Sequence, residues 1–413
     1  MPNDTAAPRQ HADTPPHADT LPLPLPLPAT ELDALAGRLA AGAAVVGLGE
    51  STRFSRETFG VREQLFRRLV RDHGFRALAV QDSTGVGQAL DAYVRGGAGS
   101  AADALAGAWR PGRTEEMAGA LEWIQNFNRD HPADPVRILG VKPVQAGEAD
   151  YDAVLAYVRT VAPERLAELA AHLEPIRTAH RIDEHVQRAR GIHPGRPFAE
   201  HARDARALVE SLAGSGTGAG AGVGVGAGDG DAVARVRLIV DFHEHSVAGR
   251  GNYAGEAELW AGTIAGFQQR TGLRTVYWDG IAHTAATEAT LGVAAERGPQ
   301  ATAGSLLRKR YGAGYVSVAI GFHHGDLGAV VAPAPAADLV DAKLGEPGLP
   351  ARWLDLRRED VRREWDGPAK ARVISGIYTP ERDAVEHLAV DSLAEAFDVL
   401  VHVRRTSPVH RLP

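Results

Sequence analysis

Short runs of apolar residues, many of them β-branched, alternate along the chain with longer amphipathic stretches. Seven runs have the length and composition of strands, at residues 43–49, 76–81, 136–141, 274–279, 315–322, 371–379 and 397–403. Most are apolar without interruption, which is typical of parallel strands buried on both faces of a sheet. Because amphipathic helical stretches separate them, the sequence predicts an α/β fold with a central, largely parallel sheet flanked by helices.

Three segments depart from this alternation and define the domain organisation. Residues 151–212 are largely helical, and we expect them to form a helical cap inserted into the domain. Residues 1–30 end in "LPLPLPLPAT", where alternating Leu and Pro disfavour both helix and interior strand, so this segment is predicted to be a disordered tail. Residues 213–231 alternate glycine with small residues after a helix, which favours a flexible linker over a phosphate-binding loop. The sequence thus predicts one α/β domain over residues 31–413.

Composition narrows the class of function. The chain of 413 residues has a net charge of −7 and no long basic run, so neither nucleic acid nor an anionic membrane is expected as a partner. The absence of cysteine excludes disulfides, thiolate nucleophiles and Cys-ligated zinc. No apolar run reaches membrane-spanning length and the first residues lack the pattern of a signal peptide, so a cytoplasmic protein is expected. We expect a small-molecule substrate, and the oligomeric state stays open.

The stretch "VVGLGESTRFSRETF", residues 45–59, concentrates charge directly after a buried strand. In the helix that follows, the apolar residues Val61 and Leu65 are four residues apart, and Glu57 lies four residues before Val61 on the same face. Glu57 is therefore expected on the inward face, at the helix start. Glu50 and Arg53 lie in the loop itself, at the carboxyl end of the strand, where open α/β sheets build their ligand sites.

The chain resembles the erythromycin esterase-like family. The segments that carry the resemblance follow in the family's order: "GLGESTRFSRETFGVREQLFRRLVRDHGFRALAV", "DAYVRGG", "ALEWIQNFNRDHP", "VRILGVKPVQ", "AHTAAT", "YGAGYVSVAIGF", "RWLDLR" and "AFDVLVHV". The resemblance extends from about residue 31 to 410. It implies an α/β hydrolytic enzyme with a helical bundle over the cleft, which opens macrolide lactones with a histidine that activates water and needs no metal or other cofactor.

The residues that carry esterase chemistry in that family are partly replaced here. By the resemblance, Arg53 occupies the position of the general-base histidine, and an arginine cannot take a proton from water. Gln81 stands in place of a glutamate and Lys142 in place of an aspartate. Of a pair of family histidines, the first position is Gly280 and only the second, His283, is retained. Because polar residues of the family are replaced here mainly by other polar residues, we interpret the site as one with altered chemistry. Loss of catalysis is the alternative.

The candidate site residues fall into two groups. The candidate catalytic residues are Glu50, Arg53, Glu57 and His283. The candidate substrate-binding residues are Arg62, Gln81, Asp82, Lys142, Arg250 and Glu256. No metal site is expected: His243 and His245 lack a third ligand at a diagnostic spacing and are interpreted as surface residues. His323, His324 and Asp326 follow a strong strand and are weaker candidates for the site.

Three functions are compatible with these residues. The first is metal-independent acid/base cleavage of an ester or lactone of a polyketide-like natural product, in which Glu50 or Glu57 with His283 activates water and Arg53 stabilises the oxyanion. The second is a non-hydrolytic cyclase, lyase or transferase in natural-product biosynthesis. The third is an inactive small-molecule-binding protein. Hydrolysis consumes water, cyclisation yields an isomer, and a binding protein gives no turnover.

Overall fold

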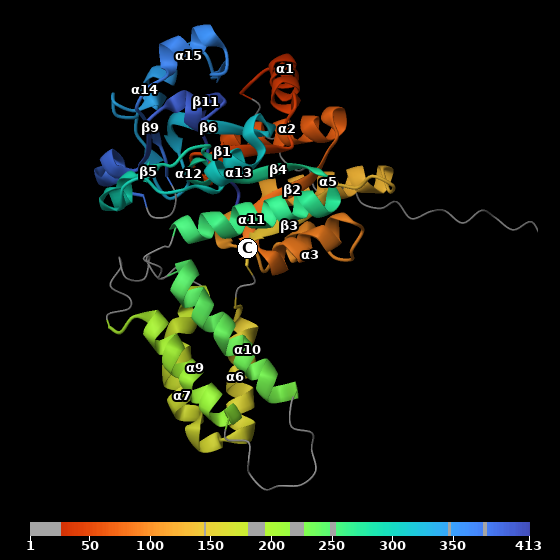
Figure 1. The fold of residues 1–413 in the computed structure, drawn as a ribbon, viewed down its shortest axis with the longest axis vertical. Coiled ribbons are helices and arrows are strands. Elements are labelled where there is room, and N and C mark those ends of the chain that lie inside the picture. Colours follow the sequence, from red (N-terminus) through yellow and green to blue (C-terminus); the bar gives the residue numbers. More distant parts are fainter. Residues whose placement is uncertain are drawn as a thin grey trace, which may run out of the picture.

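The computed structural model describes residues 26–143, 146–180, 195–214, 227–247, 253–345, 348–374 and 378–413. Its centre is an eight-stranded sheet with the order β3-β2-β4-β1-β6-β11-β8, in which β7 pairs with β6 (Figure 1). The strands are β1 (Val45–Glu50), β2 (Phe75–Ser83), β3 (Arg137–Lys142), β4 (Arg274–Gly280), β6 (Tyr315–Asp326), β7 (Val331–Ala332), β8 (Ala351–Asp355) and β11 (Val399–Thr406). All pairs are parallel except those made by β7 and β8. The predicted α/β class is therefore confirmed.

Helices cover both faces of this sheet. The helices of the main body are α1 (Ala29–Ala40), α2 (Arg56–His73), α3 (Thr84–Val94), α4 (Ala101–Ala104), α5 (Glu115–Asp130), α11 (Tyr253–Thr271), α12 (Ile281–Thr284) and α13 (Ala303–Tyr311). Successive residues of a strand point to opposite faces. Trp278 on β4 accordingly packs in the core beneath α1, α2 and α5, while its neighbour Tyr277 packs in the core beneath α11 and α13.

The glycines of "GLGE" permit close packing on the central strand β1. A Cβ atom on Gly49 would lie 2.0 Å from Thr284 Oγ1 and 2.9 Å from Ile281 Cα. One on Gly47 would lie 2.3 Å from the Tyr315 hydroxyl. Any side chain at Gly49 would therefore push the short helix α12 away from the sheet. This close approach brings the residues that follow β4 next to those that follow β1.

The C-terminal part adds a small second sheet. Its antiparallel order is β5-β10-β9, formed by β5 (Thr290–Leu291), β10 (His387–Val390) and β9 (Ala369–Arg372), with α14 (Val340–Leu344), α15 (Glu359–Trp365) and α16 (Leu393–Ala396) nearby. The run 371–379 was expected to be one strand; β9 instead ends at Arg372, and residues 375–377 lie outside the described part. The short strands β5, β7 and β10 and the edge strand β8 were not predicted.

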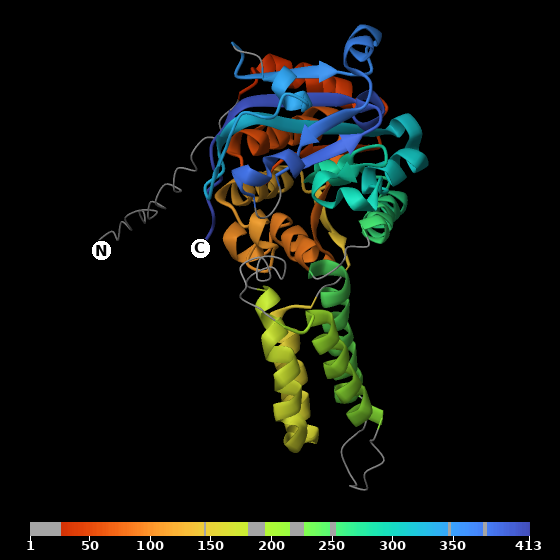
Figure 2. The same ribbon diagram turned by 90° about the vertical axis from the view of Figure 1, so that its left-hand side faces the viewer.

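A helical lobe with its own core projects from the α/β body (Figures 1 and 2). It consists of α6 (Glu148–Val161), α7 (Leu166–Arg177), α9 (Phe198–Gly214) and α10 (Ala227–Asp241). The helical insertion thus continues past residue 212, because α10 packs on α6 and α9. The predicted linker at 213–231 falls between two helices of this lobe, and α10 begins within its range; residues 215–226 lie outside the described part.

One histidine predicted at the surface is buried in this lobe. His243 lies in a π-helical turn, Phe242–Val247, and has no exposed surface. Its Nε2 lies 2.7 Å from the hydroxyl of Tyr151, which also lies 3.1 Å from His180 Nε2. Burial lowers the pKa of His243 to about 3 and that of His180 to about 4. The surface interpretation of His243 was wrong, since its ring packs among aromatic neighbours of the lobe core.

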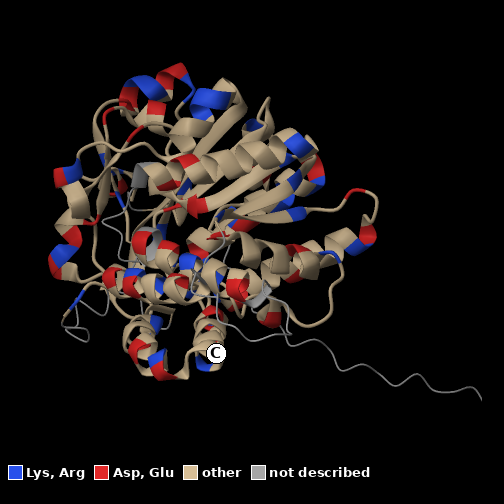
Figure 3. Ribbon diagram, turned by 60° about the horizontal axis from the view of Figure 1, so that its bottom comes forward, with Lys and Arg blue, Asp and Glu red and all other residues tan. Residues whose placement is uncertain are grey.

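The surface carries both signs of charge. Figure 3 shows Lys and Arg residues interspersed with Asp and Glu residues over the helices of the visible face. Among the described helices, none is long and apolar enough to cross a membrane.

Candidate functional site

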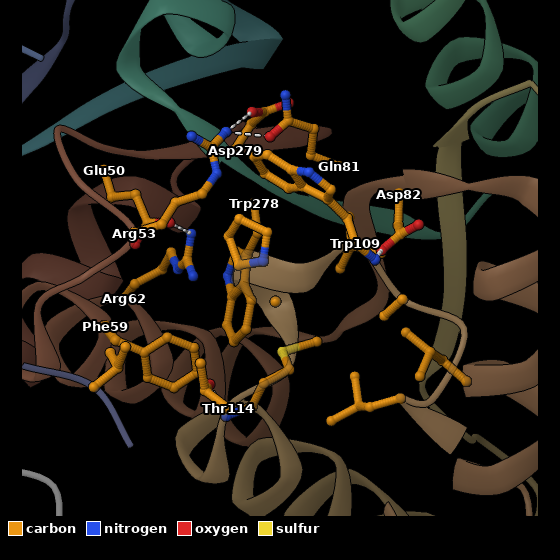
Figure 4. A pocket seen from close by; sticks show the side chains of 18 residues that line it. Glu50, Arg53, Phe59, Arg62, Gln81, Asp82, Trp109, Thr114, Trp278 and Asp279 are labelled. Carbon is orange, nitrogen blue, oxygen red and sulfur yellow. Dashed lines mark hydrogen bonds and ion pairs between the residues drawn. The ribbon is translucent and has the colours of Figure 1, made fainter. Parts of the chain in front are cut away.

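A cavity of about 80 Å³ lies at the carboxyl ends of β1, β2 and β4 (Figure 4). Its charged and amide-bearing lining residues are Glu50, Arg53, Arg62, Gln81, Asp82 and Asp279. The rest of the lining is mostly apolar and aromatic: Phe59, Val80, Leu90, Leu105, Ala108, Trp109, Pro111, Gly112, Thr114, Met117, Trp278 and Val409. The charged residues come from the strand ends and α2, whereas much of the apolar wall comes from the segment 90–117. The cavity therefore has two chemically different walls.

Glu50 and Arg62 form a buried ion pair in this cavity. Arg62 Nη1 lies 2.9 Å from Glu50 Oε1, and both side chains are at least nine-tenths buried. The Arg62 guanidinium also lies over the rings of Trp278, at 4.6 Å, and Phe59, at 5.2 Å. Burial raises the pKa of Glu50, against the opposing charge of Arg62, and burial lowers the pKa of Arg62. Arg62 thus supplies a fixed positive charge that keeps Glu50 in place.

Arg53 is the second guanidinium of the cavity. Its Nη2 donates to Gln81 Oε1 and, at 3.2 Å, to Asp279 Oδ1, and its guanidinium stacks 4.8 Å from the ring centre of Trp109 (Figure 4). These partners come from the ends of β2 and β4 and from the loop before α5. The loop after β1 therefore holds, at Arg53, a cation fixed by three different segments.

Asp279 is a site residue that sequence reasoning missed. Its side chain is fully buried, accepts from the Tyr277 hydroxyl at 2.5 Å and from the Gly280 amide at 2.6 Å, and pairs with Arg53. The available signal was its place as the polar last residue of the run 274–279, at a strand end like Glu50, which directly follows the run 43–49. Trp109 was also missed, because it lies in a loop with no strand pattern around it.

Asp82 braces the loop that carries Trp109. Its Oδ2 accepts from the Trp109 amide at 2.8 Å, and its Oδ1 accepts from the Ser83 amide at 2.7 Å. Burial raises the pKa of Asp82, although both hydrogen bonds and the charge of Lys142 oppose this. The residue lines the cavity as predicted, and its oxygens also hold the wall of the cavity in place.

Lys142, His283 and Glu256 gather beside the cavity without lining it. Lys142 Nζ lies 5.0 Å from the ring centre of Trp109 and 5.7 Å from that of Trp260, and the Trp260 ring packs 4.6 Å from the ring of His283. Glu256 interacts electrostatically with Lys142. Burial lowers the pKa of His283 to about 4, so its imidazole is neutral at pH 7.

Two predicted residues are not brought into the site. Glu57 lies at the start of α2 as expected. However, its Oε1 accepts a hydrogen bond from the Ser407 hydroxyl and its Oε2 accepts one from the Ser407 amide, both at 2.6 Å. It anchors the C-terminal segment and does not line the cavity. The catalytic role predicted for Glu57 therefore finds no support in this geometry. Arg250 lies outside the described residues.

The histidine pair that follows the strong strand also lies apart from the cavity. His323 and His324 belong to β6, and their Nδ1 atoms are 2.8 Å apart. Burial lowers the pKa of both imidazoles. Within the described ranges, no group of three or more His, Asp or Glu side chains is arranged to hold a metal ion.

The chain matches one protein family over most of its length. The model of the erythromycin esterase family matches residues 70–406, so the match begins after the Gly49–Glu50 motif. No curated protein sequence matches the chain.

Three solved structures share the fold. A succinoglycan biosynthesis protein is 20% identical, with a TM-score of 0.59 and 94% of each chain covered. A protein of Bacillus cereus is 18% identical, with a TM-score of 0.60, covering 94% of this chain and 95% of that one. A mutant of the erythromycin esterase EreC in its open conformation is 15% identical, with a TM-score of 0.53, covering 94% of this chain and 96% of that one.

Proposed function

Because the chain belongs to the erythromycin esterase family, we propose that it is an enzyme that cleaves a carboxylic ester or lactone in the cavity at the ends of β1, β2 and β4. The observation that carries this proposal is the convergence of two guanidiniums, the partly buried Arg53 and the buried Arg62, with the carboxylate of Glu50 on a single cavity. Ester cleavage needs a positive group where the carbonyl oxygen gains charge and a base that takes a proton from the attacking group.

Arg53 is the oxyanion-stabilising group in this proposal. Its charge is fixed before substrate arrives, because Gln81, Asp279 and Trp109 hold the guanidinium from three sides. A preorganised donor needs no rearrangement at the moment of reaction, and in a site that excludes water its interaction with a developing oxyanion is strong. Arg62 is engaged with Glu50 and serves mainly to position that carboxylate.

Glu50 is the base that the cavity itself provides. Burial raises the pKa of Glu50, which makes its carboxylate a stronger proton acceptor than an exposed one. His283 is neutral at pH 7 and lies beside Asp279 and Lys142, within electrostatic reach of both. It supports the same proton transfer from outside the cavity lining.

The cavity indicates the kind of group that the substrate inserts. An engineered cavity of about 150 Å³ is known to hold benzene, and this cavity is about 80 Å³. The enclosed part therefore suits a short apolar acyl or alkyl group, placed against the wall formed by Leu90, Leu105 and Met117, rather than a whole macrolactone ring. The remainder of a larger natural product stays outside.

A non-hydrolytic reaction is the second candidate. It is favoured by the Arg53 position, where the family resemblance implies a water-activating histidine, and by a cavity lining that contains no histidine among the described residues. Cyclisation or elimination needs the cation and a base but no attacking water. The mass of the product distinguishes these reactions, since hydrolysis adds one water, cyclisation gives an isomer and elimination removes a group.

The proposal is tested by steady-state kinetics on a panel of short-chain and long-chain esters and small lactones. Arg53→Ala is expected to lower kcat by about 10²–10³, the typical loss for one oxyanion donor. Arg53→Lys is expected to restore part of it, because a point charge does not reproduce the planar fork. The exposed Arg129 provides a control, and Arg129→Ala should react at the wild-type rate. Folded Arg53→Ala with wild-type kcat would contradict the proposal.

A further inference from the structure

The two carboxylate oxygens of Asp279 have different partners. Oδ2 accepts from the Tyr277 hydroxyl at 2.5 Å, whereas Oδ1 accepts from the Gly280 amide at 2.6 Å and from Arg53 Nη2 at 3.2 Å. Arg53 thus contacts one oxygen of Asp279, through a nitrogen that also donates to Gln81. An arginine and a carboxylate frequently form a bidentate pair with two parallel N–H···O bonds. The one-oxygen contact of Arg53 therefore needs a cause.

The Tyr277 hydroxyl supplies that cause. Tyr277 and Asp279 are two residues apart on β4 and point to the same face of the sheet. Tyr277 is fully buried in the core beneath α11 and α13, next to Gly47 on β1 and Ala79 on β2, whose small size leaves room for its ring. A buried hydroxyl costs free energy unless it has a hydrogen-bond partner, and Asp279 Oδ2 provides one. The hydroxyl therefore occupies the oxygen that a second nitrogen of Arg53 would otherwise take.

This arrangement leaves one edge of the Arg53 guanidinium free. A guanidinium carries five N–H donors. Within the described residues, all hydrogen bonds of Arg53 to other side chains are donated by Nη2, so Nε and Nη1 keep their donors unused. The side chain lines the cavity and is 14% exposed, so these donors are within reach of a ligand. A bidentate pair with Asp279 would use one of them up.

We propose that Tyr277 is a positioning residue for ester cleavage, whose hydroxyl restricts Asp279 to a one-oxygen contact and so keeps the free edge of Arg53 available to the substrate. This inference rests on the proposed function, in which Arg53 stabilises the oxyanion. Tyr277 does not line the cavity, so it acts on the reaction through Asp279.

A double-mutant cycle tests this role. Tyr277→Phe keeps the ring and removes the hydroxyl, and we expect it to lower kcat on the best ester of the panel by about 10- to 100-fold, since a displacement of about 1 Å can cost about 10²-fold. KM should stay near the wild-type value, because an oxyanion donor acts in the transition state. In Arg53→Ala the hydroxyl has no guanidinium to position, so adding Tyr277→Phe should lower kcat no further.

Tyr315→Phe is the matched control. Tyr315 on β6 is fully buried in the same core, but its hydroxyl donates to the Thr284 carbonyl at 2.7 Å and not to a residue that lines the cavity. Both variants lose a buried hydrogen bond, so both should lose stability in urea denaturation, while Tyr315→Phe keeps the wild-type kcat. Wild-type kcat in folded Tyr277→Phe, equal losses of kcat in the two variants, or a further loss on adding Tyr277→Phe to Arg53→Ala would overturn the proposal.

Crystal structures separate this proposal from the proposed function. We expect a one-oxygen contact between Arg53 and Asp279 in the wild type and a bidentate pair in Tyr277→Phe. If the wild type cleaves no ester of the panel, the proposed function fails, and the same two structures still test the restraint on Arg53. A bidentate pair already present in the wild type, or an unchanged Arg53 side chain in Tyr277→Phe, would overturn the proposal whether or not esters are cleaved.

Discussion

The substitution Gly87→Ala tests the packing that positions the cavity wall. Gly87 lies on α3, where an added Cβ would be 2.0 Å from Gly140 N and 2.8 Å from the Leu139 carbonyl carbon on β3. Both contacts are backbone atoms, so no side chain can rotate away. For Gly87→Ala, the helix must move by at least about 1 Å to bring the closest contact to 3.0 Å. Overpacking of this kind costs about 1–3 kcal/mol, and the better helix propensity of alanine returns up to about 1 kcal/mol.

Gly85 on the same helix is the matched control, because the nearest atom to its added Cβ is Ser83 Oγ at 3.9 Å. In urea denaturation followed by tryptophan fluorescence, Gly87→Ala should lose about 2 kcal/mol of unfolding free energy. Gly85→Ala should lose none, or gain up to about 1 kcal/mol. Because Leu90 on α3 lines the cavity, Gly87→Ala should also raise KM for short-chain esters. Equal stability of the two variants would refute the packing argument.

Three other perturbations test the lobe, the histidines and the expected absence of a metal. Tyr151→Phe should lower stability by about 1–3 kcal/mol in a denaturant titration, because it removes the hydroxyl shared by the buried imidazole of His243 and the partly buried imidazole of His180. The free energy of unfolding should fall as the pH drops from about 6.5 towards 4. In this range the unfolded chain binds protons at His180, His243 and His283, whereas the folded chain does not. A free energy of unfolding that does not change with pH would contradict the burial of these rings. Dialysis against a chelator should leave kcat unchanged, and loss of activity that zinc restores would contradict the expectation.

The central sheet was predictable because its strands are buried on both faces. β1, β2, β3, β4, β6 and β11 all fall on predicted apolar runs. The edge strand β8 was missed since Arg352, Trp353 and Leu354 are only partly buried and give no continuous apolar signal. β5 and β7 have two residues each, too few for any periodicity.

The candidate site was predictable as far as it follows from strand ends. Glu50 was predicted this way, whereas Gln81 and Asp82 were predicted from the family resemblance, and the structure brings all three to one cavity. For Glu57 the helical periodicity gave the correct location, at the start of α2, but not the partner: Ser407 is distant in sequence, and no local pattern indicates that it takes both carboxylate oxygens.

Attack of water at an acyl carbon is tested most directly by turnover in H₂¹⁸O. The purified protein is incubated with the ester and lactone panel, and the products are analysed by mass spectrometry. We expect the carboxylic acid product to carry one ¹⁸O, the ester oxygen to remain in the alcohol, and the rate to fall by about 10²–10³ in Arg53→Ala. An isomeric or dehydrated product without ¹⁸O, or binding of the panel by folded protein with no turnover, would contradict the proposed hydrolysis.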